Sequence, residues 1–307
     1  MAHSPHTAHY FVLAGPTAVG KSELAVEVAE RCGGEIVGAD AFQLYAGLEM
    51  LTAKPSAELR TRVRHHLVGE IPLSEAVDVA RYRAEALRCI AEIRGRGKVA
   101  IVCGGNGLYL RALSRGLADL PPADAGLRAE MEAQPLTELQ RRLADLDPAG
   151  AARIDLKNPR RVIRALEVCM LTGRPFSSFQ QQWGETGGGV PGVVLVRDRA
   201  ELYERIDIRT RLMFAEGVEE EVARAGECGP TASQALGLRE IRALLAGEID
   251  RATCIAAIQQ ATRHYAKRQL TWFRREPAWE PVNLTGRDPA EVAATIADTA
   301  ASALRRL

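Results

Sequence analysis

A glycine-rich segment near the N-terminus carries the residues needed to bind phosphate groups. Residues 15–22 read Gly-Pro-Thr-Ala-Val-Gly-Lys-Ser, a complete G-x-x-x-x-G-K-S motif. An apolar run precedes the motif and a helical pattern follows it, which is the strand–loop–helix order that it requires. Backbone N–H groups in such a loop bind phosphate oxygens, while Lys21 adds positive charge and the Ser22 hydroxyl is a ligand for Mg²⁺. The motif predicts a phosphate site, whether for a nucleotide or for another diphosphate.

Asp40 follows a second short apolar run and is a candidate for acid–base chemistry. In an open α/β sheet, ligands bind at the carboxyl ends of the strands. We therefore expect Asp40 to face the same crevice as the phosphate loop. Its carboxylate could act as a general base, bind Mg²⁺ or cap a turn, and the residues alone leave these three roles open.

A third apolar run, residues 99–103, passes directly into Gly-Gly-Asn-Gly at residues 104–107. Phosphate-loop enzymes that hydrolyse nucleotides carry an aspartate on a neighbouring strand to hold Mg²⁺, whereas this run has no acidic residue. Asn106 can donate and accept hydrogen bonds at the mouth of the crevice, although a tight turn without a ligand also fits the pattern. The run weighs against ATP hydrolysis and favours diphosphate as a leaving group.

A long helical pattern from about residue 251 to residue 275 combines basic and aromatic side chains. Arg263, Lys267 and Arg274 fall on one side of this helix, interleaved with aromatic residues at 265, 272 and 273. Such a face suits phosphate contact and base stacking. Taken alone, however, it is more often a solvated charged face above aromatic core residues.

The composition is that of an ordinary globular protein, with 307 residues, 47% of them hydrophobic and 26% charged. No apolar run approaches the ~20 residues of a membrane span, and the N-terminus lacks a signal-peptide pattern. We therefore expect a cytoplasmic monomer without a membrane partner. The net charge of +1 gives no general attraction to nucleic acid, but basic clusters at 153–164 and 263–275 could bind phosphates locally.

The elements that must position these residues alternate between strand and helix. Strand-like runs at 10–14, 35–40, 99–104 and 193–198 are separated by helical patterns, which predicts a doubly wound, mostly parallel α/β sheet. Residues from about 117 to 192 read as helical throughout, which indicates an all-helical insertion. We expect a core in two parts, 1–116 and 193–307, and a helical insertion domain at 117–192.

These segments together resemble the tRNA dimethylallyltransferases, also called isopentenyl transferases, in their bacterial form. The resemblance covers nearly the whole chain and rests on matching blocks in the family's order: Gly15–Ser22, Ala39–Tyr45, Thr52–Pro55, His65–Val68, Gly104–Leu113, Asn158–Val168, Ala235–Glu240 and Ala261–Arg274. It implies a P-loop NTPase-like core and a helical insertion that binds the anticodon stem-loop of tRNA.

The implied reaction transfers a dimethylallyl group from dimethylallyl diphosphate to N6 of the adenosine adjacent to the anticodon (position 37). The substrates would be tRNAs that read codons beginning with U, and the products N6-isopentenyladenosine and diphosphate. The alternative is prenylation of free AMP or ATP, as in cytokinin synthesis. The helical insertion and the basic clusters weigh against that alternative, because a small nucleotide needs neither.

The resemblance also implies roles for individual residues. Asp40 is the expected general base, assisted by Lys21 and Asn106, and Ser22 is the expected Mg²⁺ ligand. The diphosphate would be bound by the phosphate loop: Gly15, Pro16, Thr17, Ala18, Val19, Gly20, Lys21 and Ser22. The tRNA would be contacted by Asp40, Ala41, Phe42, Gln43, Asn106, Arg128, Arg160, Arg161, Arg164, Gln234, Arg239, Arg263, Lys267, Arg268 and Arg274. Ala41 and Asn106 stand where the family usually has Ser and Thr.

Overall fold

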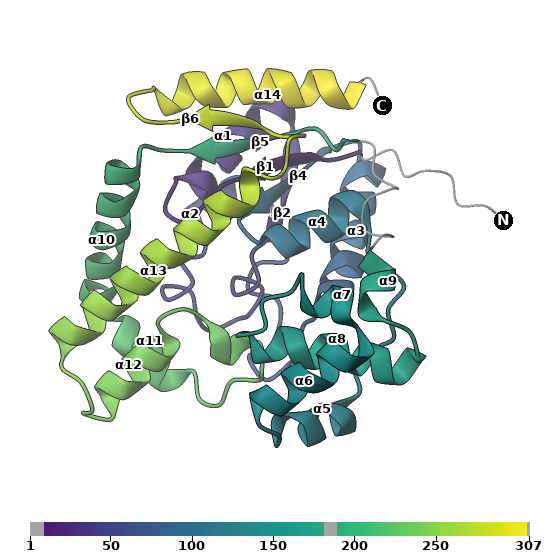
Figure 1. Ribbon diagram of the computed structural model, residues 1–307. Helices are drawn as coiled ribbons and strands as arrows, with labels where there is room; N and C mark the ends of the chain where they lie inside the picture. Colours follow the sequence, from purple (N-terminus) through teal and green to yellow (C-terminus); the bar gives the residue numbers. More distant parts are fainter. Residues whose placement is uncertain (1–8, 181–188, 306–307) are drawn as a thin grey trace. The chain divides into compact units, whose positions relative to one another are not determined.

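The computed structural model describes residues 9–180 and 189–305 (Figure 1). Of these, residues 115–180 form one compact unit, and residues 9–114 together with 189–305 form the other. We refer to them as the helical unit and the core unit. In the described part of the chain, no helix is both long and apolar enough to cross a membrane.

The core unit is built on one sheet in which every neighbouring pair of strands is parallel. The strand order is β3-β2-β4-β1-β5-β6. The strands are β1 (Phe11–Ala14), β2 (Gly34–Ala39), β3 (His65–His66), β4 (Val99–Gly104), β5 (Gly192–Val196) and β6 (Glu280–Asn283). The predicted parallel α/β core is confirmed. The two-residue strand β3 was not predicted, because so short a run leaves no alternation to detect.

Helices cover both faces of this sheet because its strands are apolar on both sides. Val12 and Ala14 of β1 pack into one core with Tyr82, whereas Phe11 and Leu13 pack into another. This division follows the two-residue period of a strand, whose successive side chains point to opposite faces. The helices are α1 (Lys21–Cys32), α2 (Ala57–Arg62), α3 (Val79–Gly95), α4 (Gly107–Arg115), α10 (Arg199–Ala215), α11 (Val218–Arg224), α12 (Leu238–Leu245), α13 (Arg251–Phe273) and α14 (Pro289–Arg305).

The helical unit has a separate hydrophobic core. Leu139 and Leu143 on one helix pack with Val162 and Leu166 on another, and all four side chains are buried. Their spacings of four residues place each pair on one face of its helix. The helices are α5 (Ala125–Glu132), α6 (Leu136–Leu146), α7 (Pro148–Ala151), α8 (Pro159–Thr172) and α9 (Phe176–Gln180).

Candidate active site

The phosphate loop connects β1 to α1, at the carboxyl end of a central strand. Gly20, which precedes the first turn of α1, has φ +98°, a left-handed conformation that favours glycine. Lys21 begins the helix, and its Nζ donates a hydrogen bond to the carbonyl oxygen of Pro16 (2.6 Å). Burial lowers the pKa of Lys21 to about 8, although nearby Cys103 and Asp40 act in the opposite direction. The N-terminus of α1 and the lysine together form a site for anionic oxygens.

A glutamine from α13 fixes the position of this loop. The side-chain oxygen of Gln269 accepts a hydrogen bond from the backbone N–H of Thr17 (2.9 Å). Its Nε2 donates to the carbonyl oxygen of Gly105, after β4 (2.9 Å). Sequence reasoning missed this residue, although there was a signal: Gln269 is polar yet lies on the buried stripe of α13 with Ala266 and Phe273.

Three arginines also hold the loop from the side of β5 and α10. Arg197 donates to the carbonyl oxygen of Val19 (2.8 Å), and Arg205 donates to that of Ala18 (2.9 Å). Arg209 donates to the hydroxyl of Thr17 (2.9 Å). Sequence reasoning missed these residues too, because only the tertiary fold brings α10 to the loop. Arg197 is paired with Glu201, so Arg205 and Arg209 are the two that add positive charge to this side of the site.

A cavity of about 530 Å³ opens beside the phosphate loop. Lys21 and Ser22 line it together with Asp40, which lies beyond the end of β2. The other lining residues include Thr17, Ala18, Gly20, Gln43, Thr52, Ala53, Lys54, Cys103, Gly104, Arg205 and Arg209. An anionic ligand held by the loop would therefore share one space with a carboxylate.

Asp40 has a defined orientation in this cavity. One oxygen, Oδ1, accepts hydrogen bonds from the backbone N–H groups of Phe42 (3.0 Å) and Gln43 (3.4 Å), so the carboxylate caps the turn that follows β2. Asp40 also lines a smaller adjoining pocket with Phe42, Leu51 and Tyr265. The carboxylate therefore stands between two spaces, one next to the phosphate loop and one with apolar walls.

Three other residues of the predicted site have structural roles. Ala41 packs against the core, and Val19 of the phosphate loop is fully buried. Asn106 lies outside the lining of both pockets. Its side-chain oxygen accepts hydrogen bonds from the N–H groups of Leu108 (3.1 Å) and Tyr109 (3.3 Å) and thereby caps α4. The side-chain NH₂ group of Asn106 takes no part in this cap.

The predicted insertion arginines fall into two groups. Arg128 and Arg164 donate to the fully buried carboxylate of Glu167, so they satisfy a charge inside the helical unit. Arg160 and Arg161 are exposed in the first turn of α8. The second group therefore offers the more accessible cations.

The basic residues of α13 do not share one surface. Arg263 forms an ion pair with Asp207, whereas Lys267 and Arg274 border a separate cavity of about 790 Å³. Arg268 is exposed and lies over the ring of Tyr265, and Gln234 and Arg239 are exposed elsewhere on the core unit. Of the aromatic residues on this helix, Phe273 is buried and Trp272 packs edge-on against it. Phe273 therefore belongs to the hydrophobic core, and Trp272 is partly buried against that core.

The cavity suits a magnesium ion only if the ligand supplies oxygens. Within residues 9–180 and 189–305, no group of three or more His, Cys, Asp and Glu side chains is arranged to hold a metal. The hydroxyl of Ser22 and the carboxylate of Asp40 line the same cavity. Mg²⁺ is commonly bound by one or two protein oxygens together with substrate phosphates and water, so this donor set fits it.

Fold and site together define a phosphate-loop α/β protein with a carboxylate facing its anion site. The family model described as IPP transferase matches residues 43–276, and the chain belongs to that family. Similar proteins include the tRNA dimethylallyltransferase of Akkermansia muciniphila, 48% identical over 86% of this chain and 90% of that one. The tRNA dimethylallyltransferase of Geobacter sulfurreducens is 45% identical over 87% of this chain and 89% of that one.

Solved structures give the same result. The full-length tRNA isopentenylpyrophosphate transferase of Bacillus halodurans superposes with a TM-score of 0.71 at 33% identity, over 98% of each chain. A eukaryotic dimethylallyltransferase, studied in structures as it acts on tRNA, gives a TM-score of 0.75 at 25% identity. That match covers 90% of this chain and 74% of the other.

Proposed function

We propose that this protein transfers a dimethylallyl group from dimethylallyl diphosphate to N6 of adenosine 37, next to the anticodon, in tRNAs that read codons beginning with U. The observation that carries the proposal is the cavity shared by Lys21 of the phosphate loop and Asp40. It would place the diphosphate leaving group and a proton acceptor on opposite sides of the reacting carbon. The names of the relatives support tRNA as the acceptor, and with a tRNA substrate the protein would act in the cytoplasm.

The reaction needs both groups because an exocyclic adenine amine is a weak nucleophile. The nitrogen lone pair attacks C1 of the dimethylallyl group, and the C1–O bond breaks so that its electron pair leaves with the diphosphate. The proton lost from N6 passes to the carboxylate of Asp40. A positioned base contributes about 10²- to 10⁴-fold to such a step, and fixed cations stabilise the charge that develops on the leaving group.

The diphosphate would lie at the N-terminus of α1, against backbone N–H groups of residues 18–22, since Pro16 has no N–H and that of Thr17 bonds to Gln269. Lys21 and Arg209 would contact its oxygens, since both line the cavity. Mg²⁺, bound through Ser22 and the diphosphate, would neutralise part of the leaving group's charge. Gln269, Arg197 and Arg205 hold the backbone of the loop, so the loop would be ordered before the ligand binds.

The adenine would enter the smaller pocket on the other side of Asp40. Phe42, Leu51 and Tyr265 give this pocket apolar walls, and base-modifying enzymes bind an extruded base between such side chains. Exposed cations, Arg160, Arg161, Arg239, Lys267 and Arg268 among them, would bind the phosphates of the stem-loop. Prenylation of free AMP or ATP is not favoured, because the relatives named above act on tRNA.

The test is transfer of label from radioactive dimethylallyl diphosphate, with Mg²⁺, to an unmodified tRNA transcript that has adenosine at position 37. We expect one label per tRNA. A matched transcript with guanosine at position 37 should remain unlabelled, because it lacks the N6 amine. Label in AMP or ATP, with none in tRNA, would overturn the proposal.

A further inference from the structure

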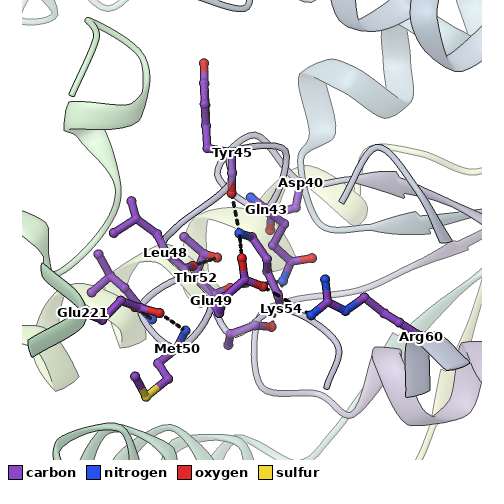
Figure 2. Close-up of polar contacts among 12 residues, drawn as sticks. Asp40, Gln43, Tyr45, Leu48, Glu49, Met50, Thr52, Lys54, Arg60 and Glu221 are labelled. Carbon is purple, nitrogen blue, oxygen red and sulfur yellow. Dashed lines mark hydrogen bonds and ion pairs between the residues drawn. The ribbon is translucent and has the colours of Figure 1, made fainter. Parts of the chain in front are cut away.

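A buried carboxylate on α11 fixes a loop that is distant from it in sequence. Glu221 is only 6% exposed. Its two oxygens accept hydrogen bonds from the backbone N–H groups of Met50 and Leu51, each at 2.8 Å. Figure 2 shows the contact between Glu221 and Met50. A carboxylate bound to two N–H groups forms charge-assisted hydrogen bonds, which are stronger than neutral ones. Glu221 therefore fixes residues 50 and 51, in the middle of the loop formed by residues 48–55.

The loop in turn is bonded to the turn that contains Asp40. The side-chain Nε2 of Gln43 donates to the carbonyl oxygens of Thr52 (3.1 Å) and Ala53 (2.9 Å). The backbone N–H of Gln43 donates to Oδ1 of Asp40 (3.4 Å). Hydrogen bonds and the backbone of residues 50–53 thus connect Glu221 to the candidate base.

The tethered residues form the walls of both spaces next to Asp40. Leu51, whose N–H bonds to Glu221, lines the smaller apolar pocket, and Thr52 lines both the pocket and the larger cavity. The phosphate loop is held by other residues, among them Gln269 and Arg205. Residues 52–55 line the larger cavity, but the N–H groups that bond to Glu221 belong to Met50 and Leu51, and Leu51 lines only the smaller pocket. Loss of Glu221 should therefore disturb the acceptor side of the site more than the diphosphate side.

We propose that Glu221 is a positioning residue, which holds Leu51, in the wall of the smaller pocket, at a fixed position relative to Asp40. The inference rests on the proposed function, since it assigns the smaller pocket to the adenine. Glu221 acts through the loop, because its contacts with the site pass through Met50 and Leu51. The tether lets a segment without regular secondary structure present a fixed surface to the base.

The test compares Glu221→Gln and Glu221→Asp with Glu220→Gln, a neighbouring residue that is exposed on the same helix. Glutamine replaces one acceptor oxygen with a donor, so one backbone N–H loses its partner. We expect Glu221→Gln to lower kcat/KM for tRNA at least tenfold while leaving the affinity for dimethylallyl diphosphate within twofold. Glu221→Asp, which keeps the charge, should recover part of the loss, and Glu220→Gln should match the wild type.

Hydrogen exchange gives a second readout that does not depend on activity. The amides of residues 48–55 should exchange at least tenfold faster in Glu221→Gln than in Glu220→Gln, while those of residues 15–22 remain unchanged. Unchanged exchange in the loop, or a donor affinity that falls as much as the tRNA kinetics, would overturn the positioning role. A wild-type protein that fails to prenylate tRNA, but whose loop is loosened by Glu221→Gln, would instead overturn the proposed function.

Discussion

The side-chain oxygen of Gln269 accepts a hydrogen bond from the backbone N–H of Thr17, across 252 positions of sequence. The same carboxamide donates to the carbonyl oxygen of Gly105. One side chain therefore joins the phosphate loop to the loop after β4. Gly105 allows this close approach, because a β-carbon there would lie 2.3 Å from Nε2 of Gln269.

Replacing Gln269 by leucine should lower both stability and diphosphate affinity. The change leaves a partly buried donor on Thr17 and a buried acceptor on Gly105 without partners, which costs about 2 kcal/mol. Urea unfolding measures the loss. Gln260→Leu, at an exposed position of the same helix, should change stability by no more than about 0.5 kcal/mol. Equal unfolding midpoints for the two variants would show that the bridge is unimportant.

Asp40→Asn should reduce kcat for tRNA prenylation by about 10²-fold or more, since asparagine cannot accept the N6 proton. Asparagine keeps a side-chain oxygen that can still accept from the N–H groups of Phe42 and Gln43, so the turn should persist. Binding of dimethylallyl diphosphate, measured by calorimetry, should change less than twofold. If kcat stays within threefold of the wild type, Asp40 is not the base.

Donor affinity should depend on pH through Lys21, whose pKa burial lowers to about 8. Lys21 is charged below this pH and neutral above it, so affinity for dimethylallyl diphosphate should be constant up to about pH 7.5. Above pH 8 the affinity should fall by about tenfold per pH unit, because neutral Lys21 must take up one proton when the diphosphate binds. The diphosphate does not cause this fall, because a phosphate ester loses its last proton with a pKa of about 6 and is therefore already fully ionised at pH 8. Lys21→Met should bind weakly with a flat profile, and an identical fall in that variant would implicate another group.

Acid stability should depend on Glu35, which lies buried on β2. Burial raises its pKa, but hydrogen bonds from Arg96, His66 and Lys98 outweigh that effect and lower the pKa to about 2 from 4.5. Stability from this carboxylate is therefore present above pH 4.5 and is lost as the pH falls toward 2. The urea midpoint of Glu35→Gln should fall less between pH 4.5 and 3 than that of the wild type. Glu58→Gln, at an exposed position, should follow the wild-type curve.

The two groups of arginines in the helical unit should respond differently to alanine. Arg128→Ala removes two hydrogen bonds of 2.9 Å from the buried carboxylate of Glu167 and should cost about 2 kcal/mol of stability. Arg160→Ala should leave stability unchanged and weaken tRNA binding. It should also lower by about one the slope of the logarithm of tRNA affinity against the logarithm of salt concentration. Binding titrations at several salt concentrations, together with thermal unfolding, separate the two effects. Equal losses of stability in both variants would contradict this assignment.

The basic face predicted for α13 shows that residue periodicity can predict a helix but cannot predict the partners of its side chains. The residue pattern predicted a helix from about residue 251 to residue 275, and α13 spans Arg251–Phe273, with Arg263 and Lys267 on it and Arg274 at its C-cap. It could not show that Arg263 bonds to Asp207, because that contact depends on the neighbouring helix α10. Likewise, the sequence placed Asn106 at the mouth of the crevice but could not show that its side-chain oxygen caps α4.

The sequence by itself determined the phosphate loop, the alternation of strands and helices, and the family. These features depend on local backbone geometry, on residue periods and on motif order, all of which can be read along the chain. Only the tertiary structure revealed the contacts of Gln269, Arg209 and Glu221 with loops more than 150 residues away. Such contacts arise when helices pack on the sheet, so the spacing of residues along the chain carries no record of them.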